Sequence, residues 1–294
     1  MKPSPNAPRN RIEREESHMS RSLSRITYLG LFVALFATAC DETTAPEGDP
    51  PEIPPQTSLV MDFSDFLNPA MAMSSDVPMA PAAGAYWNRS AVVVGVWNLI
   101  ITGTLAPPVA AFIAAATQQA EWDEELGAWT WSYNFSAIGV QHSARLEARL
   151  ITDAVQWDMY ISRDGAFEDF HWYTGESHVS GLSGFWTLNR DPDDPSEFID
   201  IDWSRSSSGD TYEITYTNIV AGAAENGSYI TYGVTGDAPY DAFYDLYGSQ
   251  GGNLTEIEWD RTTKEGRTKD PAHFEEDDWR CWGPAPDLEN TTCN

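Results

Sequence analysis

Two histidines and two carboxylates lie close together and are the residues whose types and spacing best suit chemistry. Asp169, His171, Glu176 and His178 surround the dipeptide Thr174-Gly175. If this dipeptide forms a hairpin turn, the two imidazoles face each other on neighbouring strands, with the carboxylates nearby. Imidazole and carboxylate groups arranged in this way serve as metal ligands or general bases. The simpler interpretation, which we favour, is a set of polar residues on a solvated strand face.

Other catalytic signatures are missing from the sequence. It has no HExxH motif, no nucleophile elbow, no glycine-rich phosphate loop and no zinc-type spacing. We therefore expect no catalytic residue, no metal site and no cofactor. Carboxylates are abundant, and a pair of them is enough for glycoside hydrolysis, so a carbohydrate-active enzyme stays open as a lesser alternative.

Any such group must be positioned by strands, because the sequence alternates with a period of two from Trp129 onward. Apolar residues at Trp129, Trp131, Tyr133 and Phe135 are separated by polar ones, and several later segments repeat the pattern. Such alternation is typical of half-buried antiparallel strands. Frequent turn signals leave no room for crossover helices. The sequence predicts a mainly β domain over residues 126–294, a meander of about ten strands forming a strongly curved sheet or an open barrel.

The segment before these strands has helical spacing. No charged residue occurs between Arg89 and Glu121, and apolar side chains recur three and four residues apart. The pair Pro107-Pro108 divides the stretch into halves that are too short to cross a bilayer. We predict an α-helical hairpin over residues 86–125, packed on the sheet as one folding unit with it. A hairpin inserted into a membrane is the alternative.

The N-terminus has the organisation of an export signal. Arg21 and Arg25 precede an apolar stretch of about a dozen residues, which ends in Ala37-Thr38-Ala39-Cys40. This ending resembles the lipobox of bacterial lipoproteins. The resemblance implies that residues 19–39 are a signal peptide and that Cys40 carries lipid. Residues 1–18 are then a start-site extension. An ordinary secretory signal and a transmembrane anchor are the alternatives.

Residues 40–85 have the composition of a tether. They contain eight prolines, eight acidic residues and no basic residue, which favours an extended chain. One apolar island, Leu59 to Leu67, is expected to dock on the domain. A partner-binding segment is the alternative there.

Charge narrows the possible partners. The chain has 17 basic and 45 acidic residues, a net charge of −28. Six of those basic residues and three of the acidic ones precede Cys40, so the remainder carries −31. A chain this acidic repels nucleic acids and anionic lipid head groups.

The other two cysteines close the chain. Cys281 and Cys293 should form a disulfide in an oxidising compartment, which leaves Cys40 as the odd cysteine for lipidation.

Three functions are compatible with these features. We expect a lipid-anchored protein of the bacterial cell envelope, most simply at the outer membrane, with a non-catalytic structural or interaction role. The first alternative is a module that holds an apolar ligand, such as lipid, in a curved sheet. The second is the carbohydrate-active enzyme. An empty cavity beside the helical segment distinguishes the first alternative from the main expectation.

Overall fold

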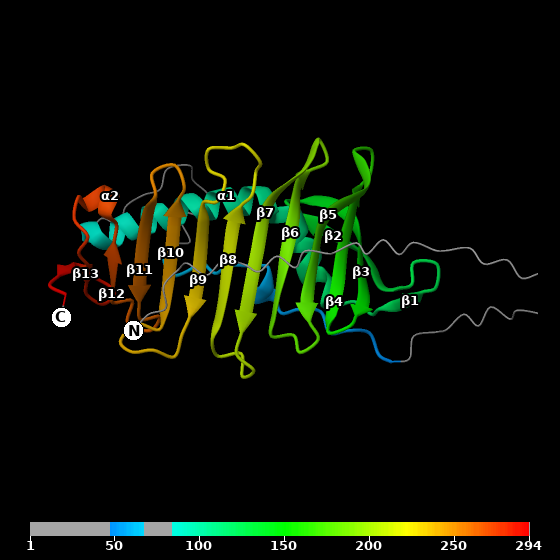
Figure 1. Ribbon diagram of the computed structural model, residues 1–294, viewed down its shortest axis with the longest axis horizontal. Helices are drawn as coiled ribbons and strands as arrows, with labels where there is room; N and C mark the ends of the chain where they lie inside the picture. The colour runs from blue at the N-terminus through cyan, green and yellow to red at the C-terminus, as the bar shows by residue number, and fades with distance from the viewer. Residues whose placement is uncertain (1–47, 68–83, 294) are drawn as a thin grey trace, which may run out of the picture. The chain divides into compact units, whose positions relative to one another are not determined.

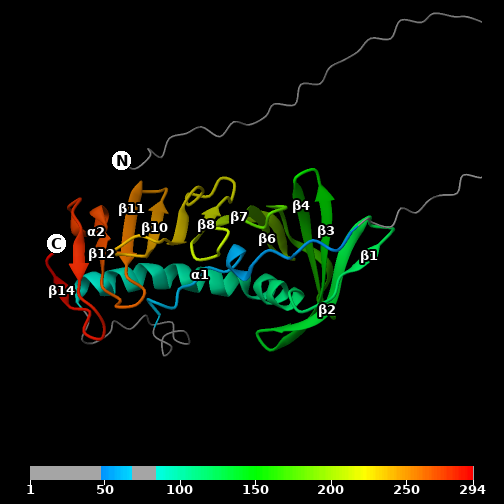
Figure 2. The ribbon, with the colours of Figure 1, turned by 90° about the horizontal axis from the view of Figure 1, so that it is seen from below.

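The structure is a computed structural model that describes residues 48–67 and 84–293. Fourteen strands form one antiparallel sheet in which each strand pairs with its neighbours in the chain. One long helix, α1, crosses a face of this sheet (Figures 1 and 2). The predicted signal peptide and Cys40 lie outside the described residues. In chain order the elements are η1 (Gln56–Ser58), α1 (Ala85–Ala115), β1 (Glu121–Asp123), β2 (Ala128–Ala137), β3 (Val140–Ile151), β4 (Ala154–Arg163), β5 (Phe167–His178), β6 (Ser183–Asp191), β7 (Asp194–Arg205), β8 (Tyr212–Asn218), β9 (Tyr229–Val234), β10 (Ala242–Gly248), β11 (Asn253–Trp259), β12 (Gly266–Lys269), α2 (Pro271–Phe274), β13 (Arg280–Trp282) and β14 (Asn290–Thr291).

The prediction of a mainly β antiparallel meander is confirmed, but the number of strands is fourteen, not ten. The strands β1, β12, β13 and β14 are only two to four residues long. Strands this short cannot show a recognisable alternation. The strand order begins at β1 and ends at β14, so within the described residues the sheet is open. The strong curvature that the sequence predicted is not confirmed.

The alternating residues divide between the two faces as expected. On β4, Trp157, Met159 and Ile161 are fully buried on the face that α1 covers. Short turns join the strands, among them Arg163 to Gly165, where Gly165 takes a positive φ of 69° that favours glycine. The buried face therefore forms one continuous aromatic and aliphatic layer under α1.

The predicted helical hairpin is wrong, because α1 is a single helix that continues through Pro107 and Pro108. A proline inside a helix removes a hydrogen bond to the carbonyl four residues earlier and bends the helix. Here those carbonyls belong to Gly103 and Thr104, which are exposed, so water can satisfy them. The last turns of α1 take a new direction (Figure 2). The proline pair thus kinks the helix without ending it.

A second segment crosses the sheet beside α1. Residues 53–67, which we call the strap, lie within the range expected to be a tether. The carbonyl of Ser58 accepts a 3.0 Å hydrogen bond from Trp186 Nε1 on β6, and the carbonyl of Leu59 accepts a 2.6 Å bond from Tyr216 Oη on β8. Further along, Asp65 accepts a 2.7 Å bond from Trp259 Nε1 on β11. The strap therefore runs across the strands, and the expected docking of its apolar island is confirmed.

The strap also contributes side chains to the core. Leu59 is fully buried and Phe66 is 2% exposed. The Phe66 ring contacts Trp259 at 4.9 Å between centroids and lies against Trp87 of α1 at 6.1 Å. The strap and the helix consequently share one apolar layer on the sheet.

The predicted disulfide between Cys281 and Cys293 is present. It encloses the turn between β13 and β14 and fixes the last strand to the sheet edge. Beside it, the amide of Tyr86 on α1 donates a 3.1 Å hydrogen bond to Asn290 Oδ1 on β14. The C-terminal edge of the sheet is thereby attached to the start of α1.

Candidate functional site

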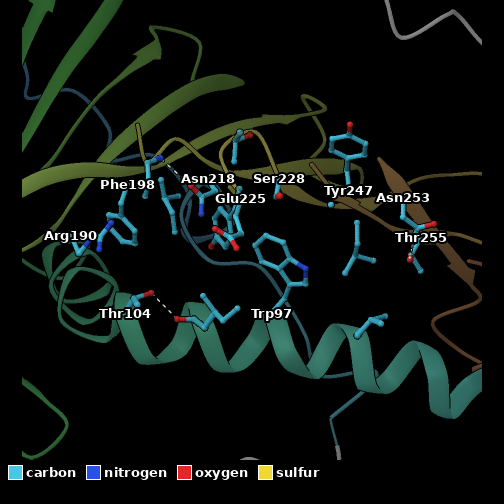
Figure 3. Close-up of a pocket in the computed structure, with 18 residues that line it drawn as sticks. Trp97, Thr104, Arg190, Phe198, Asn218, Glu225, Ser228, Tyr247, Asn253 and Thr255 are labelled. Carbon is cyan, nitrogen blue, oxygen red and sulfur yellow. Dashed lines mark hydrogen bonds between the residues drawn. The ribbon is translucent and has the colours of Figure 1, made fainter. Parts of the chain in front are cut away.

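A groove of about 540 Å³ lies between the middle of α1 and the sheet (Figure 3). From the helix it is lined by Val93, Trp97, Ile100 and Thr104, which fall on one face because they are three or four residues apart. The opposite wall comes from β7, β8, β10 and β11 and from the loop between β8 and β9, and includes Phe198, Tyr216, Val220, Leu246 and Tyr247. The volume lies within the range of small-molecule sites in proteins.

The two ends of α1 hold the helix in place beside the groove. Near its start, Arg89 forms a 2.7 Å ion pair with Asp270, whose side chain is fully buried. Near its end, the carbonyl of Ala111 accepts a 2.7 Å hydrogen bond from Tyr133 Oη, and Phe112 packs edge-on against Trp186. Trp97 lies between these two attachments and points toward the sheet (Figure 3).

Several polar groups of the groove are hydrogen-bonded to their neighbours. Glu225 Oε1 accepts a 2.6 Å hydrogen bond from Gln250, and Ser228 Oγ lies 2.9 Å from Ser249 Oγ. Arg190 is the exception, because its Nε atom lies 3.4 Å from Asp194 Oδ2 but is buried without a hydrogen-bond partner among the described residues. Among the described residues that line the groove, Glu225 is the only acidic one, so these residues supply no carboxylate pair. Its walls are suited to contact with an apolar molecule.

None of the known protein families, curated proteins or solved structures compared with this chain matches it.

The hairpin arrangement considered for the cluster at residues 169–178 is absent from β5. Thr174 and Gly175 lie inside β5 and not in a turn, so both histidines are on the same strand. Asp169 pairs with Arg145 at 3.3 Å, and His178 Nδ1 bonds to Ser180. Glu176 lies between Gln156 and Phe185 in the sheet ladder. Within the described residues no group of three or more His, Cys, Asp or Glu side chains is arranged to hold a metal ion.

His171 instead joins an ionic network that the sequence did not reveal. Its Nε2 lies 3.0 Å from Asp158 Oδ1, and Arg149 contacts both Asp158, at 3.2 Å, and Glu147, at 2.6 Å. Glu147 and Asp158 are only 2% and 6% exposed, respectively. Each buried carboxylate has a cationic or hydrogen-bonding partner, and removing one member of such a network is destabilising because it leaves a buried charge without compensation. A charged residue every second position on β3 was the available signal.

The network predicts how stability depends on pH. Burial raises the pKa of the Asp158 carboxyl, but the hydrogen bond with His171 and the charge of Arg149 outweigh burial, so the pKa is lowered. A carboxyl whose pKa is lowered by folding stabilises the fold at pH values above its ordinary pKa of about 3.9. This contribution is lost as the pH falls through the folded-state pKa. Asp158→Asn should therefore lower the free energy of unfolding at pH 7, with a smaller difference at pH 3. Urea unfolding at both pH values measures this.

The matched control is Glu168→Gln, at an exposed position of β5. An equal loss of stability at pH 7 and pH 3 for Asp158→Asn would show that the loss comes from packing and not from the charge.

Proposed function

We propose that this protein is a lipid-anchored protein of the bacterial cell envelope that binds an elongated apolar molecule in the groove between α1 and the sheet. The groove is the single observation that carries the proposal. Its walls combine Trp97, Ile100, Phe198 and Leu246, and polar groups such as those of Glu225 and Ser228 already have partners. Such a groove favours hydrocarbon over a polar solute, because burial of apolar surface supplies the binding free energy.

The envelope location is supported by sequence features and by the disulfide. The lipobox-like Ala37-Thr38-Ala39-Cys40 supports export and lipidation. The Cys281–Cys293 bond is typical of proteins in oxidising compartments. A ligand-binding role takes precedence over a purely structural one because the groove is open, whereas a structural role requires no cavity.

A groove-filling substitution tests the ligand. Val93 lines the groove. Val92, the preceding residue in the sequence, does not line it. In Val93→Trp the indole should occupy the groove and weaken binding of N-phenyl-1-naphthylamine, a neutral apolar fluorescent probe. A tenfold weaker affinity corresponds to about 1.4 kcal/mol, and we expect at least that loss. Fluorescence titration of the purified protein measures it, with displacement of the probe by a fatty alcohol.

Val92→Trp is the matched control and should bind the probe as the unmodified chain does. Circular dichroism checks that both variants are folded. Equal probe affinity in Val93→Trp and Val92→Trp would overturn the groove as the binding site.

A further inference from the structure

The side of α1 that faces away from the sheet is apolar. Val96, Leu99 and Ile100 are 47%, 47% and 49% exposed, values that are unusual for three large aliphatic side chains within two helical turns. Together with Val92 and Gly103, they follow the spacing of a single helix face. We call these five residues the outer stripe.

The outer stripe is also uncharged in a very acidic protein. No Asp, Glu, Lys or Arg occurs between Arg89 and Glu121, while the chain from Cys40 onward carries a net charge of −31. Arg89, at the start of the stripe, is neutralised by Asp270. By length and composition α1 is apolar enough to span a bilayer, yet only 28% of its most apolar window is buried in the fold. Exposed apolar surface of this extent marks an interaction site.

We propose that the outer stripe docks on a neutral, zwitterionic lipid surface. A lipid surface fits better than a second copy of the chain, because two acidic copies repel each other. It also fits better than an anionic membrane for the same reason. The stripe has the features of a helix that lies in a membrane interface with its apolar face inward, without the cationic flank that anionic lipids attract.

The position of Gly48, where the described chain begins, supports a lipid surface as the occupant of the outer stripe. This support rests on the proposed lipidation of Cys40. Seven residues separate Cys40 from Gly48. An extended chain covers about 3.4 Å per residue, so a lipid on Cys40 keeps Gly48 within about 27 Å of the bilayer. The chain leads from Gly48 into the strap, which runs beside α1 across the face of the sheet that α1 covers (Figure 2). The anchor thus keeps the α1 side of the domain near the membrane.

Docking in this orientation places the groove at the lipid surface. Ile100 both belongs to the outer stripe and lines the groove. A hydrocarbon chain that leaves the bilayer beside Ile100 would reach the groove without crossing water. The ligand class that follows is therefore a membrane lipid with an acyl chain.

Fluorescence quenching tests the docking on the full lipid-bearing chain. An environment-sensitive dye is attached to Leu99→Cys, and the protein is mixed with phosphatidylcholine vesicles that contain a nitroxide-labelled lipid. The control label is at Phe185→Cys, a 39% exposed position of β6 whose neighbour Trp186 faces α1, so that Phe185 points to the opposite side of the sheet. We expect quenching at position 99 to exceed that at position 185 at least about twofold.

Two further measurements separate the possible occupants. Val96→Glu should abolish quenching at position 99, whereas Phe185→Glu should leave that quenching unchanged. Replacing half the phosphatidylcholine by phosphatidylglycerol should weaken the quenching at position 99. Equal quenching at both labels would overturn the proposal. A blue-shifted dye at position 99 that the nitroxide lipid does not quench would instead indicate a second copy on the stripe. The affinity of Val93→Trp for the fluorescent probe is measured independently of vesicle quenching. A failure of the docking proposal can therefore be distinguished from a failure of the proposal that the groove binds ligand.

Discussion

Replacing Phe66 by alanine should lower the free energy of unfolding by about 3–5 kcal/mol, the range for a buried phenylalanine in a packed core. Phe66 is 2% exposed, and its ring lies among Trp87, Trp259 and Trp282. Alanine would leave a cavity bounded by large aromatic rings, which are poorly able to collapse into it. The effect should therefore match that of a central strand residue, although Phe66 belongs to the strap. Urea unfolding at pH 7 measures it.

The control for this prediction is Phe185→Ala. Phe185 is 39% exposed on the opposite face of the sheet, so its loss should cost about 1 kcal/mol or less. If Phe66→Ala and Phe185→Ala have equal free energies of unfolding, the strap does not contribute to the core in solution.

The second large effect concerns the membrane. Cys40→Ser should abolish incorporation of labelled palmitate and move the protein from the detergent phase to the aqueous phase in a phase-partition experiment. Serine cannot form the thioether to diacylglycerol that the lipobox resemblance implies, and the chain from residue 40 is otherwise very acidic. Acyl chains contribute about 0.8 kcal/mol per buried methylene group, so the loss should be close to complete.

Cys293→Ser removes a different cysteine and serves as the control, since it should leave both lipid labelling and partition unchanged. Lipid labelling that persists in Cys40→Ser would refute the anchor.

The β architecture was predictable because burial of one face imposes alternation. Trp157, Met159 and Ile161 are placed as the pattern requires. The charged face of β3 was less predictable, because Arg145, Glu147 and Arg149 alternate with small or aliphatic residues, a composition equally typical of a helix. The charges are explained by carboxylates on neighbouring strands, since Asp158 of β4 pairs with Arg149 and Asp169 of β5 pairs with Arg145. That pairing is a tertiary fact, absent from local sequence.

Gly175 suggested a hairpin turn between the two histidines for a related reason. A Cβ atom there would lie 2.4 Å from Trp186 Cε3, so the glycine is required by a ring on the neighbouring strand and not by a turn. Gly184 is covered by Trp203 in the same way. A glycine beneath an aromatic ring and a glycine in a turn look identical in one sequence.

The groove itself could not be predicted, because it depends on the path of α1. All the helix residues that line the groove precede Pro107, so the proline pair gave no information about how far this part of α1 lies from the sheet. The sequence did identify an empty cavity beside the helical segment, with Trp97, Ile100, Phe112 and Ile113 as the side chains that could fill it, as the feature that decides between the functions. The structure places Trp97 and Ile100 in the wall of an open groove.

The nearest-neighbour order of the strands has a consequence for how the protein folds. Because every strand pairs with the next one in the chain, the sheet contacts are local in sequence, and such contacts form quickly. An array of this kind, left alone, would lose its strands one at a time from either edge, as repeat proteins do. The strap and α1 cross many strands and connect distant parts of the array. They convert a row of independent hairpins into a unit that unfolds cooperatively, so the segments that we propose to bind ligand and membrane also determine whether the domain persists as a whole.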